Sequence, residues 1–226
     1  MRFRPILIAA ALAAASPAAA QTDHDSAVWV NVTAMGSIDE KLVYFAEVQP
    51  RVTDDVSRLS QLLLRGAVGY RITPEITLYQ GYAHIEEPSG AGIPGRNEER
   101  SFQQLSWSLH KAGRADLSSR TRFEQRWRSD GGGMALRLRE MLRYEHALSD
   151  RERSVGALVW AEGFWGLKSG GWAVREFDQL RSFVGAVIPL PGKSTLEAGY
   201  MNQLRDAPGA RSNMAHIASL TAFIRY

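Results

Sequence analysis

The stretch IASLTAFIRY, residues 217–226, closes the sequence and alternates between two kinds of side chain. Successive side chains of an extended chain point to opposite faces. One face is wholly apolar and consists of Ala218, Leu220, Ala222, Ile224 and Tyr226. The opposite face includes the polar residues Thr221 and Arg225. A strand with these two faces suits the closing strand of an outer-membrane β-barrel, which meets lipid outside and water inside.

A secretory signal peptide is predicted for residues 1–20. Arg2 and Arg4 form a short basic region, an apolar run begins at residues 6–12, and small residues at 16–20 end it before cleavage after Ala20. The alternative is an amino-terminal membrane helix, but the apolar run is too short to span a bilayer comfortably. We therefore expect Sec-type export to the outer membrane of a Gram-negative bacterium, with residues 21–226 forming a single barrel domain.

Charge and cysteine content narrow the class of protein. The chain has no cysteine, so the exported form lacks disulfides and depends on a hydrogen-bonded scaffold. Without Arg2 and Arg4 it keeps 25 basic and 24 acidic residues, a net charge of +1. These charges form no basic tail or block, so we expect no nucleic-acid partner.

The pattern after residue 20 is that of recurring strands. No stretch of about 20 apolar residues is available there for a transmembrane helix. Segments bounded by turn-forming residues recur instead, and the ten clearest are 42–51, 58–72, 75–86, 100–111, 117–128, 134–146, 154–167, 175–190, 195–205 and 214–226. Strands of this length favour tilted membrane crossings over a soluble sandwich with one solvated face, which is the alternative.

The strand count depends on residues 28–34. This segment also looks like a strand, but an eleventh strand in an antiparallel barrel places the amino terminus at the wrong end. Either the segment lies in the lumen, which leaves ten strands, or another crossing is hidden around residues 165–172, which gives twelve. We predict an all-β fold, a transmembrane up-and-down antiparallel β-barrel with twelve strands, ten being the alternative.

Connection lengths indicate how the barrel is oriented. The connections after Glu86, Arg128, Lys168 and Arg205 are long or glycine-rich, and those after Ile72, Lys111, His146 and Leu190 are short. Outer-membrane barrels have long external loops and short periplasmic turns. The carboxy terminus is therefore expected on the periplasmic side.

Several segments carry charges on one face only. In residues 117–127, the charged residues alternate with a face that includes Leu117, Phe123 and Trp127. Rows of arginine cannot lie in a soluble core without partners, so we expect them on the inner wall. The candidates for lining the lumen are Glu47, Arg51, Arg65, Arg100, Arg120, Arg122, Glu124, Arg126, Arg137, Arg139, Arg143, Arg181, Glu197 and Arg205. They either fill a narrow lumen with ion pairs or line a small path for anions.

Large aromatic residues are predicted to mark the boundaries of the membrane. They are Trp127, Tyr144, Trp160, Trp165, Tyr200 and Tyr226. Stacking on a sugar is the alternative role. The expected partners are outer-membrane lipids and lipopolysaccharide, together with the barrel-assembly machinery, which would recognise the carboxy-terminal strand and Tyr226.

Short motifs in a specific order span nearly all of residues 21–226. They are Trp29, Leu64-Arg65 with Gly69-Tyr70, Gly81-Tyr82, Glu99-Arg100 before Gln104-Leu105, RTRFEQR at 120–126, FDQLR at 177–181 and EAGYM at 197–201. In these motifs the chain resembles the outer-membrane protein family catalogued as domain of unknown function 2490. The resemblance implies a β-barrel in the outer membrane. It implies no established activity, ligand or catalytic residue.

The predicted function is that of a narrow porin-like channel or a structural envelope component, with an Arg/Glu-lined lumen that has room for a small solute. The alternative is a membrane-embedded hydrolase of lipids or lipopolysaccharide, with a base among His84, His110, His146 and His216. Ser–His catalysis needs a nucleophile and a base in contact, which sequence spacing does not establish. The sequence has neither a Gly-X-Ser-X-Gly motif nor His-X-X-X-His spacing, so no catalytic residue, metal or cofactor is predicted.

Overall fold

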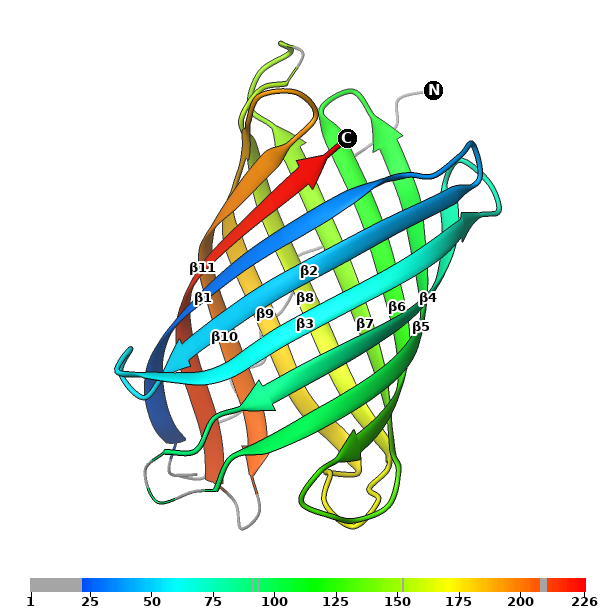
Figure 1. The fold of residues 1–226 in the computed structure, drawn as a ribbon. Helices are drawn as coiled ribbons and strands as arrows, with labels where there is room; N and C mark the ends of the chain where they lie inside the picture. The colour runs from blue at the N-terminus through cyan, green and yellow to red at the C-terminus, as the bar shows by residue number, and fades with distance from the viewer. Residues whose placement is uncertain (1–21, 91, 93, 152, 208–210) are drawn as a thin grey trace, which may run out of the picture.

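A computed structural model describes residues 22–90, 92, 94–151, 153–207 and 211–226, which form one closed β-barrel (Figure 1). The predicted signal peptide, residues 1–20, lies outside the described residues. The wall is built from β1 (Thr22–Ser37), β2 (Leu42–Thr53), β3 (Arg58–Arg71), β4 (Ile76–Glu87), β5 (Arg96–Ala112), β6 (Ala115–Arg128), β7 (Ala135–Ala147), β8 (Gly156–Lys168), β9 (Glu176–Pro189), β10 (Thr195–Ala207) and β11 (Arg211–Arg225). The prediction of an all-β barrel is confirmed.

The strand count predicted from the sequence is wrong, because the described barrel has eleven strands and neither twelve nor ten. The ten predicted segments correspond to β2–β11, and the segment around residues 28–34 is part of the wall as β1. No further crossing lies at residues 165–172 of the described chain, because β8 continues to Lys168 and residues 169–175 connect it to β9.

The barrel closes through a parallel pair of strands. Strand β1 runs beside β11 in the same direction, with Trp29 opposite Ser219 and Met35 opposite Arg225. All other neighbouring strands are antiparallel. When the number of strands is odd, the first and last strands start at the same end of the barrel. These two strands must therefore pair in parallel. The expectation of antiparallel pairing throughout fails at this seam, because it assumed an even count.

The direction of β11 distinguishes the two ends of the barrel. The C-terminal end, where β11 finishes, holds the connections 38–41, 72–75, 113–114, 148–155 and 190–194. The opposite end, where β11 begins, holds 54–57, 88–95, 129–134, 169–175 and the link from β10 to β11. The predicted alternation of lengths is only partial, because 148–155 is as long as 88–95 and 54–57 is short.

The outer wall is largely apolar, although it also carries a hydrogen-bonded row of Gln80, Gln103 and Gln125. Exposed side chains on the strands include Val30, Val32, Val48, Leu64, Val68, Leu78, Leu142, Val159, Leu180, Val184, Ile188 and Leu220. In the closing strand, Leu220 is exposed and Ile217 is buried inside, which confirms the two faces predicted for residues 217–226. The alternation therefore separates an apolar exterior from the interior along the wall.

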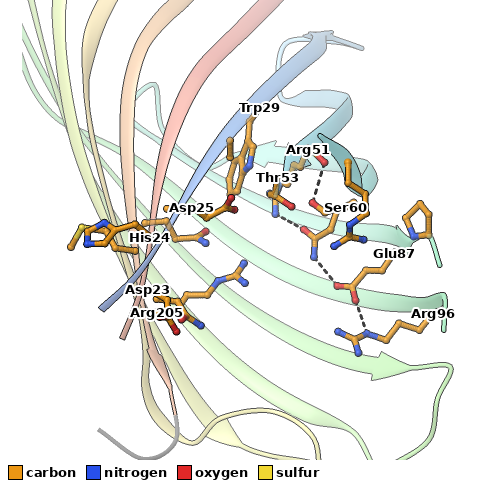
Figure 2. A pocket seen from close by; sticks show the side chains of 18 of the residues that line it. Asp23, His24, Asp25, Trp29, Arg51, Thr53, Ser60, Glu87, Arg96 and Arg205 are labelled. Carbon is orange, nitrogen blue, oxygen red and sulfur yellow. Dashed lines mark hydrogen bonds and ion pairs between the residues drawn. The ribbon is translucent and has the colours of Figure 1, made fainter. Parts of the chain in front are cut away.

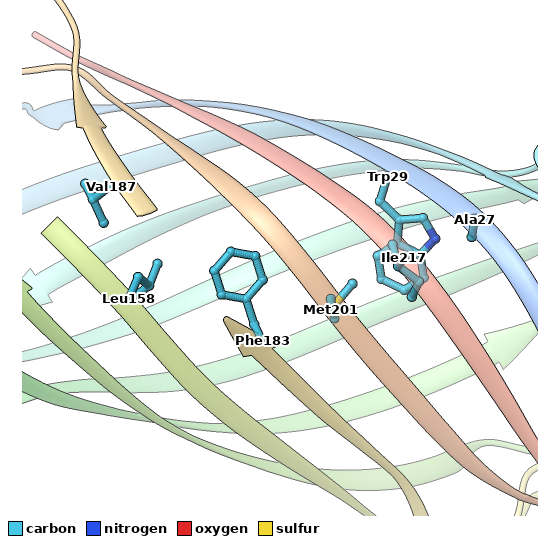
Figure 3. Packing of buried hydrophobic residues seen from close by; sticks show 7 residues of the cluster. All are labelled: Ala27, Trp29, Leu158, Phe183, Val187, Met201 and Ile217. Carbon is cyan, nitrogen blue, oxygen red and sulfur yellow. The ribbon is translucent and has the colours of Figure 1, made fainter. Parts of the chain in front are cut away.

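The interior has an apolar side and a charged side. A row of apolar side chains follows the inner face from β8 to β1 and comprises Ala27, Trp29, Leu158, Phe183, Val187, Met201 and Ile217 (Figure 3). Phe183 fits because Gly185 and Gly199 carry no side chain, and a Cβ at either position would lie 2.6–2.7 Å from its ring. Across the barrel, Phe102 likewise covers Gly81, where an added Cβ would lie 2.1 Å from its ring. Aromatic rings over cross-strand glycines help to fix strand register.

Candidate functional site

Two buried glutamates organise the centre of the charged side. The carboxylate of Glu124, which is 1% exposed, accepts hydrogen bonds from Arg137 Nη2 at 2.6 Å and Arg139 Nη1 at 2.9 Å. The carboxylate of Glu162, 2% exposed, accepts from Arg139 Nη2 at 2.8 Å and Arg120 Nη2 at 2.8 Å. Arg139 therefore bridges the two carboxylates. Glu124 comes from β6, Arg139 from β7 and Glu162 from β8, so the bridge ties three strands together.

A third carboxylate extends this arrangement toward the end opposite the C-terminal end. Glu98 on β5 accepts from Arg100 Nε at 2.7 Å and from Arg126 Nε at 2.5 Å. All three side chains are buried. Charge-assisted pairs of this kind are strong, and they offset the cost of removing ions from water. We call Glu98, Glu124, Glu162 and their arginines the ion-pair layer.

Aromatic rings supply a second kind of support for the buried guanidinium groups. Phe164 lies under Arg137, Arg139 and Arg181, whose guanidinium carbons are 4.5–5.2 Å from the ring centre. Phe102 contacts Arg122 at 4.6 Å and Arg65 at 5.9 Å. Cation–π contacts are worth most where water is excluded, so these rings stabilise charges inside the barrel.

Three buried arginines have no carboxylate at hydrogen-bond distance in the part of the chain that the structure describes. Arg51 donates to Gln49 at 2.6 Å and Gln61 at 2.9 Å, and it stacks on Trp29 at 3.9 Å. Arg122 donates to Gln104 and lies 3.9 Å from Glu124, which Arg137 and Arg139 already occupy. Arg181 donates to Gln203 at 3.0 Å, and to Gln179 once that amide is turned to face it. Amide partners satisfy hydrogen bonds but leave the positive charges uncompensated.

Two further ion-paired groups lie nearer the C-terminal end. Arg65 on β3 lies 3.1 Å from the carboxylate of Glu47 on β2, and both side chains are largely buried. Arg143 on β7 donates to Glu197 across the barrel at 2.8 Å and to Glu145 on its own strand at 2.8 Å. The contact from Arg143 to Glu197 joins strands that are not neighbours in the wall. It therefore braces the barrel across its interior.

Among the described residues, cavities lie on each side of the Trp29–Arg51 pair. The cavity at the end opposite the C-terminal end measures about 360 Å³ and is lined by Arg205, among others (Figure 2). Hydrogen bonds cross its wall from Arg51 through Gln61 to Glu87, which also pairs with Arg96. This chain links β2 to β5.

The second cavity, which we call the C-terminal cavity, measures about 480 Å³. It reaches Glu75 in the connection between β3 and β4, at the C-terminal end. Its charged lining consists of Arg51, Arg65, Arg120, Arg122, Arg139, Arg143, Arg181, Glu47, Glu75, Glu162 and Glu197. Trp29 and Arg51 line both cavities, so this stacked pair forms part of the partition between them.

The predicted lumen-lining residues all lie on the inner wall. Those in or bonded to the ion-pair layer are Arg100, Arg120, Glu124, Arg126, Arg137 and Arg139. Glu47, Arg51, Arg65, Arg122, Arg143, Arg181 and Glu197 line the C-terminal cavity, whereas Arg205 lies apart from them in the other cavity. Sequence reasoning missed Glu98 and Glu162. Glu98 shares a strand face with an arginine of the ion-pair layer, and Glu162 shares a strand face with a buried aromatic ring.

One of the aromatic residues assigned to the membrane boundary lies elsewhere. Trp160 points into the barrel, where it stacks on Phe183 with centroids 5.3 Å apart and lines the C-terminal cavity. Its assignment to the outer surface is wrong because it lies on the same face of β8 as Glu162, which is buried. The remaining five rings are exposed, and they are Trp127, Tyr144, Trp165, Tyr200 and Tyr226.

Three of the four candidate histidines make side-chain hydrogen bonds within the described part of the chain. His84 bonds Glu99 at 2.7 Å, His146 bonds the Tyr144 hydroxyl, and His216 bonds His24 at 3.0 Å. None of these contacts in the described chain joins a histidine to a serine, so the hydrolase alternative gains no nucleophile and base from them. Among the described residues no cluster of three or more His, Asp or Glu is suited to a metal ion. The same residues include no helix with the length and apolar character needed to cross a membrane.

Comparison with known proteins gives a family and one relative. The family described as "Protein of unknown function (DUF2490)" matches residues 26–214. An uncharacterized protein of Methylorubrum extorquens is 41% identical over 216 residues, which cover 95% of this chain and 94% of the relative. No solved structure matches the chain.

Proposed function

The chain belongs to the DUF2490 family of proteins of unknown function, and we propose that this member is an outer-membrane β-barrel whose ion-paired interior braces the wall and closes the lumen. Its role in this proposal is that of a structural envelope component. The proposal includes export through a signal peptide at residues 1–20, followed by insertion of residues 21–226 as one domain.

The apolar outer wall supports the membrane location. Monomeric soluble proteins rarely expose apolar patches larger than a few hundred Å². In this barrel, apolar side chains are exposed on neighbouring strands, for example Val48 on β2 beside Leu64 on β3. In water such a wall favours aggregation, whereas in a bilayer it is the solvated face. The outer face is therefore the surface that would contact outer-membrane lipids and lipopolysaccharide.

The single observation that supports a closed lumen is the bridge that Arg139 makes between Glu124 and Glu162. Both carboxylates are at most 2% exposed, so no continuous film of water surrounds them. Separating such a pair costs several kcal/mol because each ion is left without its partner in a poorly hydrated space. On this proposal the layer obstructs the part of the lumen that Glu124, Arg139 and Glu162 occupy.

A narrow porin-like channel is the second candidate. The observation in its favour is that cavities of about 360 and 480 Å³ approach the partition from opposite ends. A path would open if the Trp29–Arg51 stack moved aside. Its excess of arginine would then favour anions.

Orientation and assembly follow from the strand pattern. We place the C-terminal end in the periplasm, as expected from the connection after Lys111, where only residues 113–114 separate β5 from β6. The barrel-assembly machinery would recognise β11, in which inward and outward side chains alternate and which is followed by the exposed Tyr226. Neither the contact with lipid nor the contact with the assembly machinery requires a residue of the ion-pair layer.

Two experiments test the proposal separately. Membrane fractionation of cells that express the full chain should place it in the outer membrane, and recovery in the soluble periplasmic fraction without detergent would refute the location. Purified protein in planar lipid bilayers should show no conductance above that of the empty bilayer. Discrete anion-selective steps would refute the closed lumen and favour the porin-like candidate.

A further inference from the structure

The C-terminal cavity carries an excess of positive charge. Seven arginines and four glutamates are among the described residues that line it, which leaves three positive charges without an acidic counterpart in the lining. The opposite cavity is nearly balanced, with four arginines against two aspartates and one glutamate. The C-terminal cavity therefore attracts anions more strongly, and its walls exclude much of the water that would screen them.

Unsatisfied hydrogen-bond donors lie in the same place. Arg65 Nε, Arg120 Nε and Arg122 Nη1 are shielded from solvent and have no acceptor among the described residues. The side chain of Arg65 is 8% exposed and that of Arg122 is 2% exposed. The guanidinium carbons of both lie within 5.9 Å of the centre of the Phe102 ring. Buried donors that lack a partner carry a desolvation cost that an anionic acceptor would remove.

One side of the wall toward the C-terminal end is apolar, whereas Glu75, Thr77 and Ser108 make other parts of the lining there polar. Met35 lies near the end of β1, Tyr79 near the start of β4 and Phe223 near the end of β11, all at the C-terminal end of the barrel. Trp160 and Met141 also line the cavity, and Met141 lies opposite Arg120 in the pairing of β6 with β7. A ligand that fits both features has a negatively charged head for the arginines and an apolar tail for this side of the wall.

We infer that the C-terminal cavity binds a small anion with an apolar tail, of the alkyl carboxylate class. The negative head lies among Arg65, Arg120 and Arg122, and the tail lies against Met35, Tyr79 and Phe223. A volume of about 480 Å³ lies within the range of about 300–1,000 Å³ typical of small-molecule sites. The inference concerns only the barrel interior, so a barrel that conducts yet binds the anion would refute the closed lumen and leave this site intact.

The test uses the full barrel in nanodiscs of zwitterionic lipid, titrated by calorimetry with decanoate at pH 7. Decanol is the uncharged probe of equal length, inorganic phosphate is the anion without a tail, and empty nanodiscs give the background. Decanoate should bind above the background, and neither decanol nor phosphate should match it. Equal binding of decanol would refute the role of the arginines, and equal binding of phosphate would refute the role of the apolar wall.

Variants locate the site inside the barrel. Arg122→Gln and Arg65→Gln should each weaken decanoate binding by about 10-fold or more, because each loses a charge-assisted hydrogen bond. Arg205→Gln is the matched control, since Arg205 lines the opposite cavity, and it should leave the affinity within about 2-fold. Heat-modifiable migration on gels shows which variants still form the barrel. Affinity that is unchanged in a folded Arg122→Gln barrel would overturn the assignment.

Glu47→Gln gives an effect of the opposite sign. It removes one carboxylate from the lining and frees the guanidinium of Arg65, so decanoate should bind more tightly by several-fold. A merely structural role for the Glu47–Arg65 pair predicts weaker binding instead, because the wall would be disturbed. Weaker binding by Glu47→Gln would therefore count against an anion site at Arg65.

Discussion

Replacing Glu124 by glutamine should destabilise the barrel by about 3 kcal/mol. The substitution keeps the shape of the side chain but removes a carboxylate that is 1% exposed and accepts from Arg137 and Arg139. Breaking a buried pair by removing one partner costs about 3–5 kcal/mol. The lower bound applies, because Arg139 keeps Glu162 and Arg137 keeps Asp178 at 3.5 Å.

Urea unfolding in lipid vesicles, followed by tryptophan fluorescence, measures this loss. With a slope of about 1–3 kcal/mol per molar urea, a loss of about 3 kcal/mol lowers the midpoint by about 1–3 M. The matched control is Glu145→Gln, because Arg143 keeps Glu197 and the partly exposed Glu145 pair contributes less than about 1 kcal/mol. Equal midpoint shifts in the two variants would refute the central place given to the ion-pair layer.

Three further outcomes are expected. In the same vesicles Glu140→Gln should leave the midpoint unchanged or raise it, because Glu140 bonds Ser119 and Thr121 on the outer face, where lipid disfavours charge; a loss equal to that of Glu124→Gln would contradict the bilayer location. Gly81→Ala should cost about 1–3 kcal/mol by displacing the buried ring of Phe102, and Phe102→Leu in the same chain should recover part of it; a wild-type midpoint for Gly81→Ala would contradict this packing. The hydrogen bond from Arg128 lowers the pKa of the Asp130 carboxyl below its ordinary value of 3.8, so the contact stabilises the loop above pH 3.8 and is lost as the pH falls through the folded-state pKa. Arg128→Gln should raise the Asp130 midpoint in an NMR titration toward 3.8, and an unchanged midpoint would exclude Arg128 as the cause.

Alternation in the sequence predicted which residues line the interior, but not how they pair. Period-two patterns are local, so the face that carries Arg137, Arg139 and Arg143 can be read from β7 alone. Whether Arg139 meets Glu162 depends on the register between β7 and β8, which sets Met141 opposite Glu162. Register depends on bulges and packing across strands, such as the irregularity at Leu136/Arg137.

The missed residues have equally specific causes. Glu98 was missed because the predicted strand began at residue 100, whereas β5 begins at Arg96. Glu162 was missed because its strand is otherwise apolar. Leu158, Trp160, Glu162 and Phe164 share one face, so recognising Glu162 as an inner residue would also have placed Trp160 inside. A single carboxylate in an apolar strand is thus a stronger signal for the interior than an aromatic residue is for the membrane boundary.

The predicted number of strands was wrong for a different reason, which is the topology of the barrel. The pattern in residues 28–34 correctly indicated a strand, but the parity of an antiparallel barrel excluded it from the wall. The parallel pairing of β1 with β11 removes that restriction, since β1 bonds β11 on one side and β2 on the other. No property of residues 28–34 alone distinguishes a parallel from an antiparallel neighbour.

Bracing alone does not explain the charge balance of the interior. Glu98, Glu124 and Glu162 each accept hydrogen bonds from two arginines, and Arg51, Arg122 and Arg181 add buried charges whose hydrogen-bond acceptors among the described residues are amides. A layer that served stability alone would be better matched in charge, or replaced by apolar side chains of similar volume, which is often neutral or stabilising. The surplus of arginine therefore carries a cost in the unliganded barrel. An anion in the C-terminal cavity removes part of that cost, so the bracing of the wall and the proposed binding site depend on the same arginines.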